Sequence, residues 1–276
     1  MSSLIALLKE LFSYTFVIRA MIVGVLVALC SALLGVTLVL KRYSMIGDGL
    51  SHVGFGTLAV AMSLGLAPLQ VSIPVVLLAA FLLLRISENS RIKGDAAIAL
   101  ISSSSLAIGV IIISVTTGMN ADVCNYMFGS ILAMSRSDVY LSITVAVLVL
   151  ILYVLSYNRI FAVTFDENFA RATGVKAGRY NTLIAFLTAM VIVVGMRMMG
   201  AMLISSLIIF PALTAMRVFS SFKRVVICSA ILSVACFLIG ITLSFAFSTP
   251  AGASIVIVNL AAFCLFWSAE KLGLKA

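Results

Sequence analysis

Apolar runs of about 20 residues recur along the whole chain, and short polar or charged segments separate them. The hydrocarbon core of a bilayer is about 30 Å thick, so a helix needs about 20 apolar residues to cross it. The pattern therefore predicts an all-α, polytopic membrane protein with eight or nine transmembrane helices, at residues 17–40, 44–66, 68–86, 95–117, 138–156, 181–199, 200–217, 225–247 and 251–269. The count depends on Gly200, because residues 181–217 could form two spans or one span plus a half-helix.

Three segments fall outside this pattern. Residues 1–15 mix leucines with Lys9 and Glu10, which predicts a short amphipathic helix at the membrane interface. Residues 120–135 are apolar but short, which predicts a broken or interfacial helix. The longest polar connection is 157–180, and no stretch is long enough for a second domain. We therefore predict a single transmembrane domain over residues 1–276.

Composition supports the membrane assignment and gives an orientation. The chain is 63% hydrophobic and 10% charged, whereas soluble proteins carry about 25% charged residues. If 157–180 faces the cytoplasm, 14 of the 18 basic residues lie on that side: Lys41, Arg42, Arg85, Arg91, Lys93, Arg159, Arg171, Lys176, Arg179, Arg217, Lys223, Arg224, Lys271 and Lys275. Cytoplasmic loops of membrane proteins are rich in Lys and Arg, so we expect the C-terminus in the cytoplasm. The net charge of +9 then reflects topology and gives no reason to expect nucleic-acid binding.

The only histidine, His52, follows Asp48 by four residues inside an apolar run. Residues four apart share one face of a helix, so the two side chains point the same way. Counted from Arg42 at 1.5 Å per residue, His52 lies about 15 Å deep, near the bilayer midplane. Gly56 continues this face and is expected to leave room beside it.

Placing a charged side chain at that depth costs a free energy of roughly 3 kcal/mol, so the pair is expected to serve a function. A carboxylate and an imidazole together suit Zn²⁺, Mn²⁺ or Fe²⁺. Two alternatives remain from the residues alone. The pair could be hydrogen-bonded and tie two helices together, or it could relay protons in a transporter that needs no ATPase.

The connection 157–180 contains the sequence FDENFARATGV. Asp166 and Glu167 suit the first turn of a short helix, where carboxylates favour the positive end of the helix dipole. Phe169 and Ala170 follow, and Gly174 suits the helix end. Such a helix could dock a soluble partner, or it could be a solvated connector that packs on its own membrane domain.

Catalytic motifs are missing from the sequence. It contains no GxxxxGK[ST] motif and no Gly-Lys dipeptide, so it carries no P-loop, and an ATPase that powered it would be another chain. A single histidine, with neither HExxH nor GxSxG, also argues against an intramembrane hydrolase. We therefore expect a subunit that is not itself an enzyme.

Further residues predict packing. Arg197 could pair with Asp122 or Asp138 at the outer end, and Pro211 could kink its span. Small residues at four-residue spacing let helices approach closely, within one subunit or between subunits, and these are Gly24, Ala28 and Ala32.

The segment LGVTLVLKRYSMIGDGLSHVGFG (34–56) resembles the start of the permease subunits of ATP-binding-cassette (ABC) importers for zinc, manganese and iron. The GD-x-x-SH signature of that family corresponds here to Gly47, Asp48, Ser51 and His52. The segments YMFGSILAMSRSD (126–138), FDENFARATGV and MGAMLISSLIIFPALTA (199–215) resemble further family landmarks in the same order, so the resemblance covers nearly the whole chain.

The resemblance implies a homodimer in a bacterial cell membrane, with the translocation path at the subunit interface. It also implies cytoplasmic ATP-binding subunits and an extracytoplasmic metal-binding protein as partners. Asp48 and His52 would contact the transported ion, and the residues that couple to the ATPase would be Asp166, Glu167, Phe169, Ala170 and Gly174. No permanently bound cofactor is expected. With one histidine in the chain, zinc, manganese and iron all remain open as the ion.

Overall fold

The computed structural model describes residues 15–89, 94–116 and 135–272. The interfacial helix expected at 1–15 lies outside the described residues except for Thr15, and the helix expected at 120–135 lies outside them except for Ser135. The described residues contain no strand, which confirms the all-α fold. They form ten helices: α2 (Thr15–Leu40), α3 (Ile46–Ser63), α4 (Pro68–Asn89), α5 (Gly94–Thr116), α7 (Arg136–Phe165), α8 (Glu167–Ala172), α9 (Ala177–Met199), α10 (Ala201–Val218), α11 (Phe222–Phe247) and α12 (Ala251–Lys271).

Nine of these helices coincide with the nine predicted spans, and α8 is the short helix of the connection. Seven are long and apolar enough to cross a membrane, namely α2, α4, α5, α7, α9, α11 and α12. The shorter helices α3 and α10 are the other two of the nine that coincide with predicted spans. Gly200 separates α9 from α10 with a φ of +88°, a conformation that glycine adopts without strain. The helix break predicted there is present, and the count of eight or nine spans stays a prediction.

The helix α7 is longer than its predicted span. It continues to Phe165 rather than ending at residue 156, because Ile160 and Val163 keep a buried face through the polar sequence Tyr157–Arg159. The connection 157–180 is therefore helical over much of its length, with only a few residues between α7, α8 and α9.

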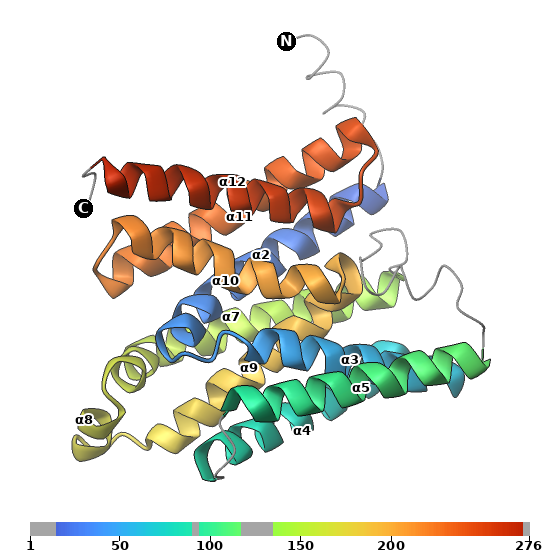
Figure 1. The fold of residues 1–276 in the computed structure, drawn as a ribbon, viewed down its shortest axis with the longest axis horizontal. Helices are drawn as coiled ribbons and strands as arrows, with labels where there is room; N and C mark the ends of the chain where they lie inside the picture. The colour runs from blue at the N-terminus through green and yellow to red at the C-terminus, as the bar shows by residue number, and fades with distance from the viewer. Residues whose placement is uncertain (1–14, 90–93, 117–134, 273–276) are drawn as a thin grey trace.

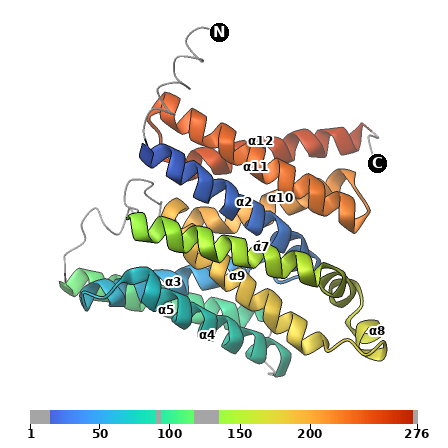
Figure 2. The ribbon, with the colours of Figure 1, turned by 180° about the vertical axis from the view of Figure 1, so that it is seen from behind.

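The helices form two groups with α7 and α9 between them (Figures 1 and 2). One group contains α2, α10, α11 and α12, and the other contains α3, α4 and α5. The helix α3 packs against α4, α5, α9 and α10, so it lies where the two groups meet. The Asp48–His52 face therefore belongs to a central helix.

Small residues on α2 pack within the chain. A Cβ at Gly24 would overlap the ring of Phe237 on α11. One and two turns further along, the carbonyl of Ala28 accepts a hydrogen bond from Ser233 Oγ (2.8 Å) and that of Ala32 accepts one from Ser229 Oγ (3.4 Å). Of the two possibilities left by the spacing, the structure shows contact inside one subunit.

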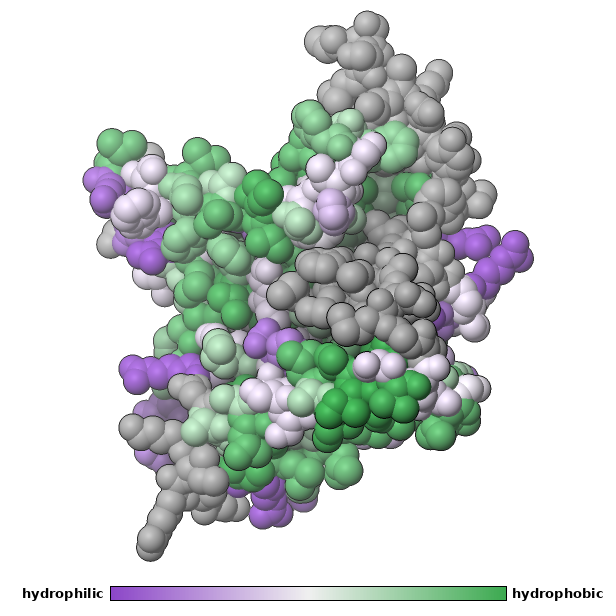
Figure 3. All heavy atoms as spheres, turned by 45° about the vertical axis from the view of Figure 1, so that its right-hand side comes forward, coloured by the Kyte–Doolittle hydropathy of each residue, from purple (hydrophilic) through white to green (hydrophobic). Residues whose placement is uncertain are grey.

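Both ends of the bundle carry polar groups, and the surface between them is apolar. The α2–α3 turn, α8, the α10–α11 turn and the end of α12 lie at the same end, on the left in Figure 1. Only 22% of the apolar stretch of α12 is buried inside the protein, and only 28% of the apolar stretches of α5 and α7. In Figure 3, apolar residues make up large patches of the face that is not drawn in grey, and the most hydrophilic residues lie mainly toward its edges. Such a surface requires lipid around it, so the chain is a multi-pass membrane protein.

At the opposite end, Arg197 Nη2 lies 3.1 Å from Asp138 Oδ2. This contact confirms one of the two partners predicted for Arg197. The other, Asp122, lies outside the described residues. The pair joins the end of α9 to the first turn of α7.

Candidate functional site

Asp48 and His52 face each other near the start of α3. Asp48 lies in the first turn, where the positive end of the helix dipole favours a carboxylate. His52 Nε2 is 3.7 Å from Asp48 Oδ2, which is longer than a hydrogen bond. The side chain of His52 is 18% exposed and that of Asp48 is 43% exposed. The two side chains are therefore partly exposed and do not hydrogen-bond to each other.

The second imidazole nitrogen of His52, Nδ1, is buried and has no hydrogen-bond partner among the described residues. A buried polar nitrogen without a partner costs about 1–3 kcal/mol. The ring is therefore not held by a network that satisfies both of its nitrogens. This does not fit the alternative in which the pair exists only to tie helices together.

The glycines of α3 set the distance to its neighbours. A Cβ at Gly56 would lie 2.6 Å from the carbonyl oxygen of Ser105 on α5. The space that the sequence suggested beside Gly56 is therefore occupied by the α5 backbone. Gly47 sits against Ile208 of α10, where a Cβ would make an ordinary contact at 3.4 Å. Ser51 Oγ donates to the carbonyl of Asp48 (2.7 Å), inside the same helix.

The start of α3 also changes the estimated depth of His52. The helix begins at Ile46, so His52 lies about 9 Å from its first residue at 1.5 Å per residue. Counting from Arg42 gave a larger value, because residues 41–45 form a turn rather than helix.

The connection between α7 and α9 contains the predicted short helix, α8. Asp166 caps its start, where Oδ1 accepts a hydrogen bond from the Phe169 backbone N–H (2.9 Å). At its end Gly174 has a φ of +87° and donates to the carbonyl of Arg171 (3.1 Å). Val175 donates to the carbonyl of Ala170 (2.9 Å). This pair of bonds is the Schellman motif, and it gives α8 a fixed end.

One side of α8 is anchored and the other is open. Ala170 is fully buried and packs with Val163 of α7 and Ala177 of α9. Phe169, the neighbouring residue, is 64% exposed. The exposed ring of Phe169 and the fixed end of the helix make α8 a candidate docking element.

Glu167 connects α8 to two other segments. Its Oε2 accepts a hydrogen bond from Asn181 Nδ2 of α9 (3.1 Å) and lies 3.5 Å from Lys41 Nζ, just after α2. Its Oε1 accepts one from Arg171 Nη2 on α8 itself (2.6 Å). Burial raises the pKa of the Glu167 carboxyl, but the hydrogen bonds from Asn181 and Arg171 and the charge of Lys41 outweigh it and lower the pKa below its usual range.

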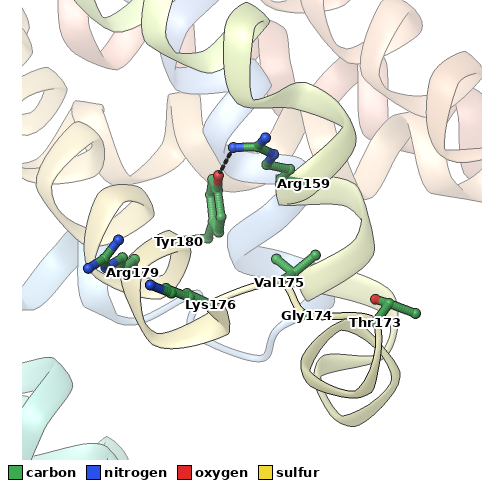
Figure 4. Close-up of a pocket in the computed structure, with 7 residues that line it drawn as sticks. All are labelled: Arg159, Thr173, Gly174, Val175, Lys176, Arg179 and Tyr180. Atoms are coloured by element: carbon green, nitrogen blue, oxygen red, sulfur yellow. Dashed lines mark hydrogen bonds between the residues drawn. The ribbon is translucent and has the colours of Figure 1, made fainter.

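A cavity of about 320 Å³ opens beside the end of α8 (Figure 4). Its lining contains three cations, Arg159 of α7 and Lys176 and Arg179 at the start of α9, and no acidic residue. Arg159 Nη1 donates to the Tyr180 hydroxyl (2.6 Å). The remaining lining comes from Thr173, Gly174 and Val175. This end of the bundle therefore offers a positive hollow next to an exposed aromatic ring.

The sequence did not single out Tyr180 or Asn181, and it placed Arg159 and Lys41 only among the flanking basic residues. Among the described residues, no group of three or more His, Cys, Asp or Glu side chains is placed to hold a metal. Asp48 and His52 are thus two candidate ligands from one chain.

A family model described as the ABC 3 transport family matches residues 13–269, nearly the whole chain. The chain belongs to the ABC 3 transport family. The resemblance to metal-cation ABC permeases, stated above from four sequence segments, is confirmed.

Curated relatives extend over the same length. The manganese import system permease protein ScaB of Streptococcus gordonii is 31% identical over 265 residues, covering 96% of this chain and 95% of that protein. The high-affinity zinc uptake system membrane protein ZnuB of Haemophilus influenzae is 29% identical and covers 89% of this chain and 94% of that protein. This ABC 3 family member is thus similar to membrane components of transport systems rather than to their ATPases.

Solved structures agree with the fold. The chain superposes on PsaBC from Streptococcus pneumoniae, determined in complex with Fab, with a TM-score of 0.85, 30% identity and coverage of 97% of this chain and 99% of that chain. An inward-facing ABC transporter gives a TM-score of 0.74 at 16% identity, which supports the fold alone.

Proposed function

We propose that this chain is the transmembrane permease subunit of an ATP-driven importer of divalent transition-metal ions in a bacterial cell membrane. Family membership and the names of the relatives, which specify manganese and zinc, support the class of cargo. The observation that carries the proposal is the facing pair of Asp48 and His52 on the central helix α3.

The spacing of this pair suits an ion held between the two side chains. Ligand–metal distances are about 2.0–2.2 Å for imidazole nitrogen and carboxylate oxygen, so one ion can reach two ligands up to about 4.2 Å apart. The 3.7 Å separation of Nε2 and Oδ2 lies inside this limit. A hydrogen bond would have brought these atoms closer. The Asp48 side chain is 43% exposed, so an ion could approach the pair.

Two ligands from one chain favour a path shared by two copies. A tetrahedral site needs four ligands, and two chains related by a two-fold axis supply two carboxylates and two imidazoles. We propose a homodimer on this ground. The ion should be held only modestly, because a site in a transport path must also release it.

The proposed docking site for a cytoplasmic ATP-binding subunit is α8 with the neighbouring cavity. Phe169 would enter an apolar groove of that subunit, while Arg159, Lys176 and Arg179 would attract acidic side chains at its rim. The bundle end that carries α8 also carries the C-terminal end of α12. The C-terminus would then be cytoplasmic, and an extracytoplasmic metal-binding protein would dock at the opposite end.

The test is metal uptake by proteoliposomes that contain the permease, its ATP-binding subunits and its binding protein. We expect ATP-dependent uptake of Mn²⁺ or Zn²⁺, with ATPase activity stimulated by the transported ion. His52→Gln and Asp48→Asn should each lower the initial rate about tenfold or more, because each replaces a strong ligand with a neutral amide that binds these ions more weakly. Ser63→Ala, at the other end of the same helix, is the matched control and should transport normally.

If both ligand variants retain normal uptake, the assignment of Asp48 and His52 is wrong. Uptake that proceeds without ATP-binding subunits would instead favour the alternative, a secondary transporter in which the pair relays protons.

A further inference from the structure

We infer that Lys41, Glu167 and Asn181 form a latch that passes movement of α8 to the start of α3, the helix that carries Asp48 and His52. The inference rests on the proposed function, because it concerns how ATPase-driven movement reaches the ion path. It assigns a role to two residues, Lys41 and Asn181, that lie outside both the ligand pair and the docking helix.

The three side chains close a triangle between three segments. Lys41 Nζ donates to Asn181 Oδ1 and lies 3.5 Å from Glu167 Oε2, and Asn181 Nδ2 donates to the same Oε2 at 3.1 Å. Glu167 belongs to the first turn of α8, and Asn181 to the start of α9. Lys41 directly follows α2. Movement of α8 therefore displaces a group that is bound directly to the end of α2.

Burial makes this triangle costly to break. Only 8% of the Lys41 side chain is exposed, and Asn181 is 6% exposed. Separating a buried charge from its partner destabilises a protein far more than separating a surface pair does. The lowered pKa of Glu167 keeps its carboxylate charged near neutral pH, so the contact persists under working conditions.

The turn that follows Lys41 is too short and too well bonded to absorb a displacement. Arg42 donates to the carbonyl of Val39 (3.1 Å) and Tyr43 donates to that of Leu38 (2.8 Å), which fixes the end of α2. The N–H of Ile46, the first residue of α3, then donates to the carbonyl of Tyr43 (3.0 Å). A shift of Lys41 must therefore shift the first turn of α3, where Asp48 lies.

The latch predicts separate effects on ATP hydrolysis and on transport. In the reconstituted complex, Lys41→Met should still co-purify with the ATP-binding subunits and keep its ATPase activity within about twofold. The number of ions moved per ATP should fall about fivefold or more, which is the scale of a typical coupling free energy between two sites. Lys41→Arg keeps the charge and should restore most of the ratio.

Arg171→Gln is the matched control. Arg171 contacts the same carboxylate but lies on α8 itself, four residues from Glu167, so its loss breaks no link between segments. Because Arg171 also lies on the proposed docking helix, the comparison uses only the ratio of ions to ATP in the assembled complex, and we expect a normal ratio for this variant. The thermal midpoint of each purified variant is measured in parallel. A moderate fall is expected for Lys41→Met, because it breaks a buried contact. A complex that still assembles and hydrolyses ATP shows that the uncoupling is not a folding defect.

The outcomes separate the latch from the proposed function. A normal ratio in Lys41→Met overturns the latch. Loss of subunit binding or a collapse of the thermal midpoint in Lys41→Met also overturns it, because Lys41 would then serve docking or folding. If the wild-type complex neither hydrolyses ATP in response to metal nor transports metal, the proposed function itself fails, and the latch fails with it.

Discussion

A glycine on the Asp48–His52 face of α3 fixes how closely α5 approaches. In Gly56→Ala the new Cβ would meet the Ser105 carbonyl at 2.6 Å, and backbone atoms cannot yield as a flexible side chain can. Overpacking of this kind costs about 1–3 kcal/mol. We expect a lower thermal midpoint for the full chain in detergent, together with reduced metal uptake.

Gly178→Ala is the control for that experiment. A Cβ at Gly178 meets no atom within 4 Å, and the residue lies in the first turn of α9. Alanine favours helix over glycine, so the midpoint should stay the same or rise. Equal destabilisation by the two substitutions would contradict the close α3–α5 contact.

The lowered pKa of Glu167 predicts how the stability of the folded protein depends on pH. Its pKa is lowered from an ordinary 4.5 in the folded protein. A depressed carboxyl pKa stabilises the fold above the unfolded-state pKa, and this contribution is lost as the pH falls through the folded-state pKa. Stability from this group should therefore be constant from pH 8 to about 6 and decline below about 4.5.

The measurement is the thermal midpoint of the wild type and of Glu167→Gln between pH 8 and pH 3.5. The difference between the two proteins should be constant at neutral pH and shrink in acid. A difference that already changes between pH 8 and pH 6 would show that Glu167 titrates near neutrality, against the direction of its pKa.

At the scale of the element, the end of α8 depends on Gly174 in a left-handed conformation, with a φ of +87°. A residue with a Cβ costs about 1–2 kcal/mol there. In Gly174→Ala we expect the Schellman hydrogen bonds to weaken and α8 to present Phe169 less well. Co-purification of the ATP-binding subunits should drop.

Gly65→Ala is a matched control for backbone strain. Gly65 also has a positive φ, +66°, and a Cβ there likewise meets nothing within 4 Å, but it follows α3 at the far end from α8. Both substitutions should lower the thermal midpoint similarly, and only Gly174→Ala should weaken subunit binding. Normal binding in Gly174→Ala would argue against α8 as the docking element.

How far the sequence predicts these elements depends on the range of the forces involved. Runs of about 20 apolar residues locate the spans, because a bilayer imposes that length on each helix independently. The end of α7 escaped prediction, because Tyr157–Arg159 interrupts the hydropathy while Ile160 and Val163 still pack inside. Local hydrogen bonding, by contrast, made α8 predictable through Asp166 and Gly174.

The candidate site was likewise predictable from the sequence only in part. Asp48 and His52 could be paired from their spacing, because four residues make one helical turn. Lys41 and Glu167 are separated by 126 positions, and Lys41 and Asn181 by 140, so nothing local indicates their contact. Such a triangle follows only from the packing of α2, α8 and α9 together.

At the scale of the whole molecule, the number of ligands predicts the metal stoichiometry. One chain contributes Asp48 and His52, and the described residues hold no group of three or more His, Cys, Asp or Glu side chains that would complete a site within that chain. If two copies share the ion, saturated protein binds one ion per two chains. A site completed within each chain would bind twice as much.

Equilibrium dialysis of the full chain in nanodiscs against Mn²⁺ or Zn²⁺, followed by elemental analysis, distinguishes the two stoichiometries. We expect one ion per two chains for the wild type and for Ser63→Ala, and none above empty nanodiscs for His52→Gln. One ion per chain would rule out the shared site, since two copies would then each hold an ion without help from the other. The two candidate ligands of each chain already lie 3.7 Å apart on one helix. In the proposed site, dimer formation would therefore only have to bring in the second pair.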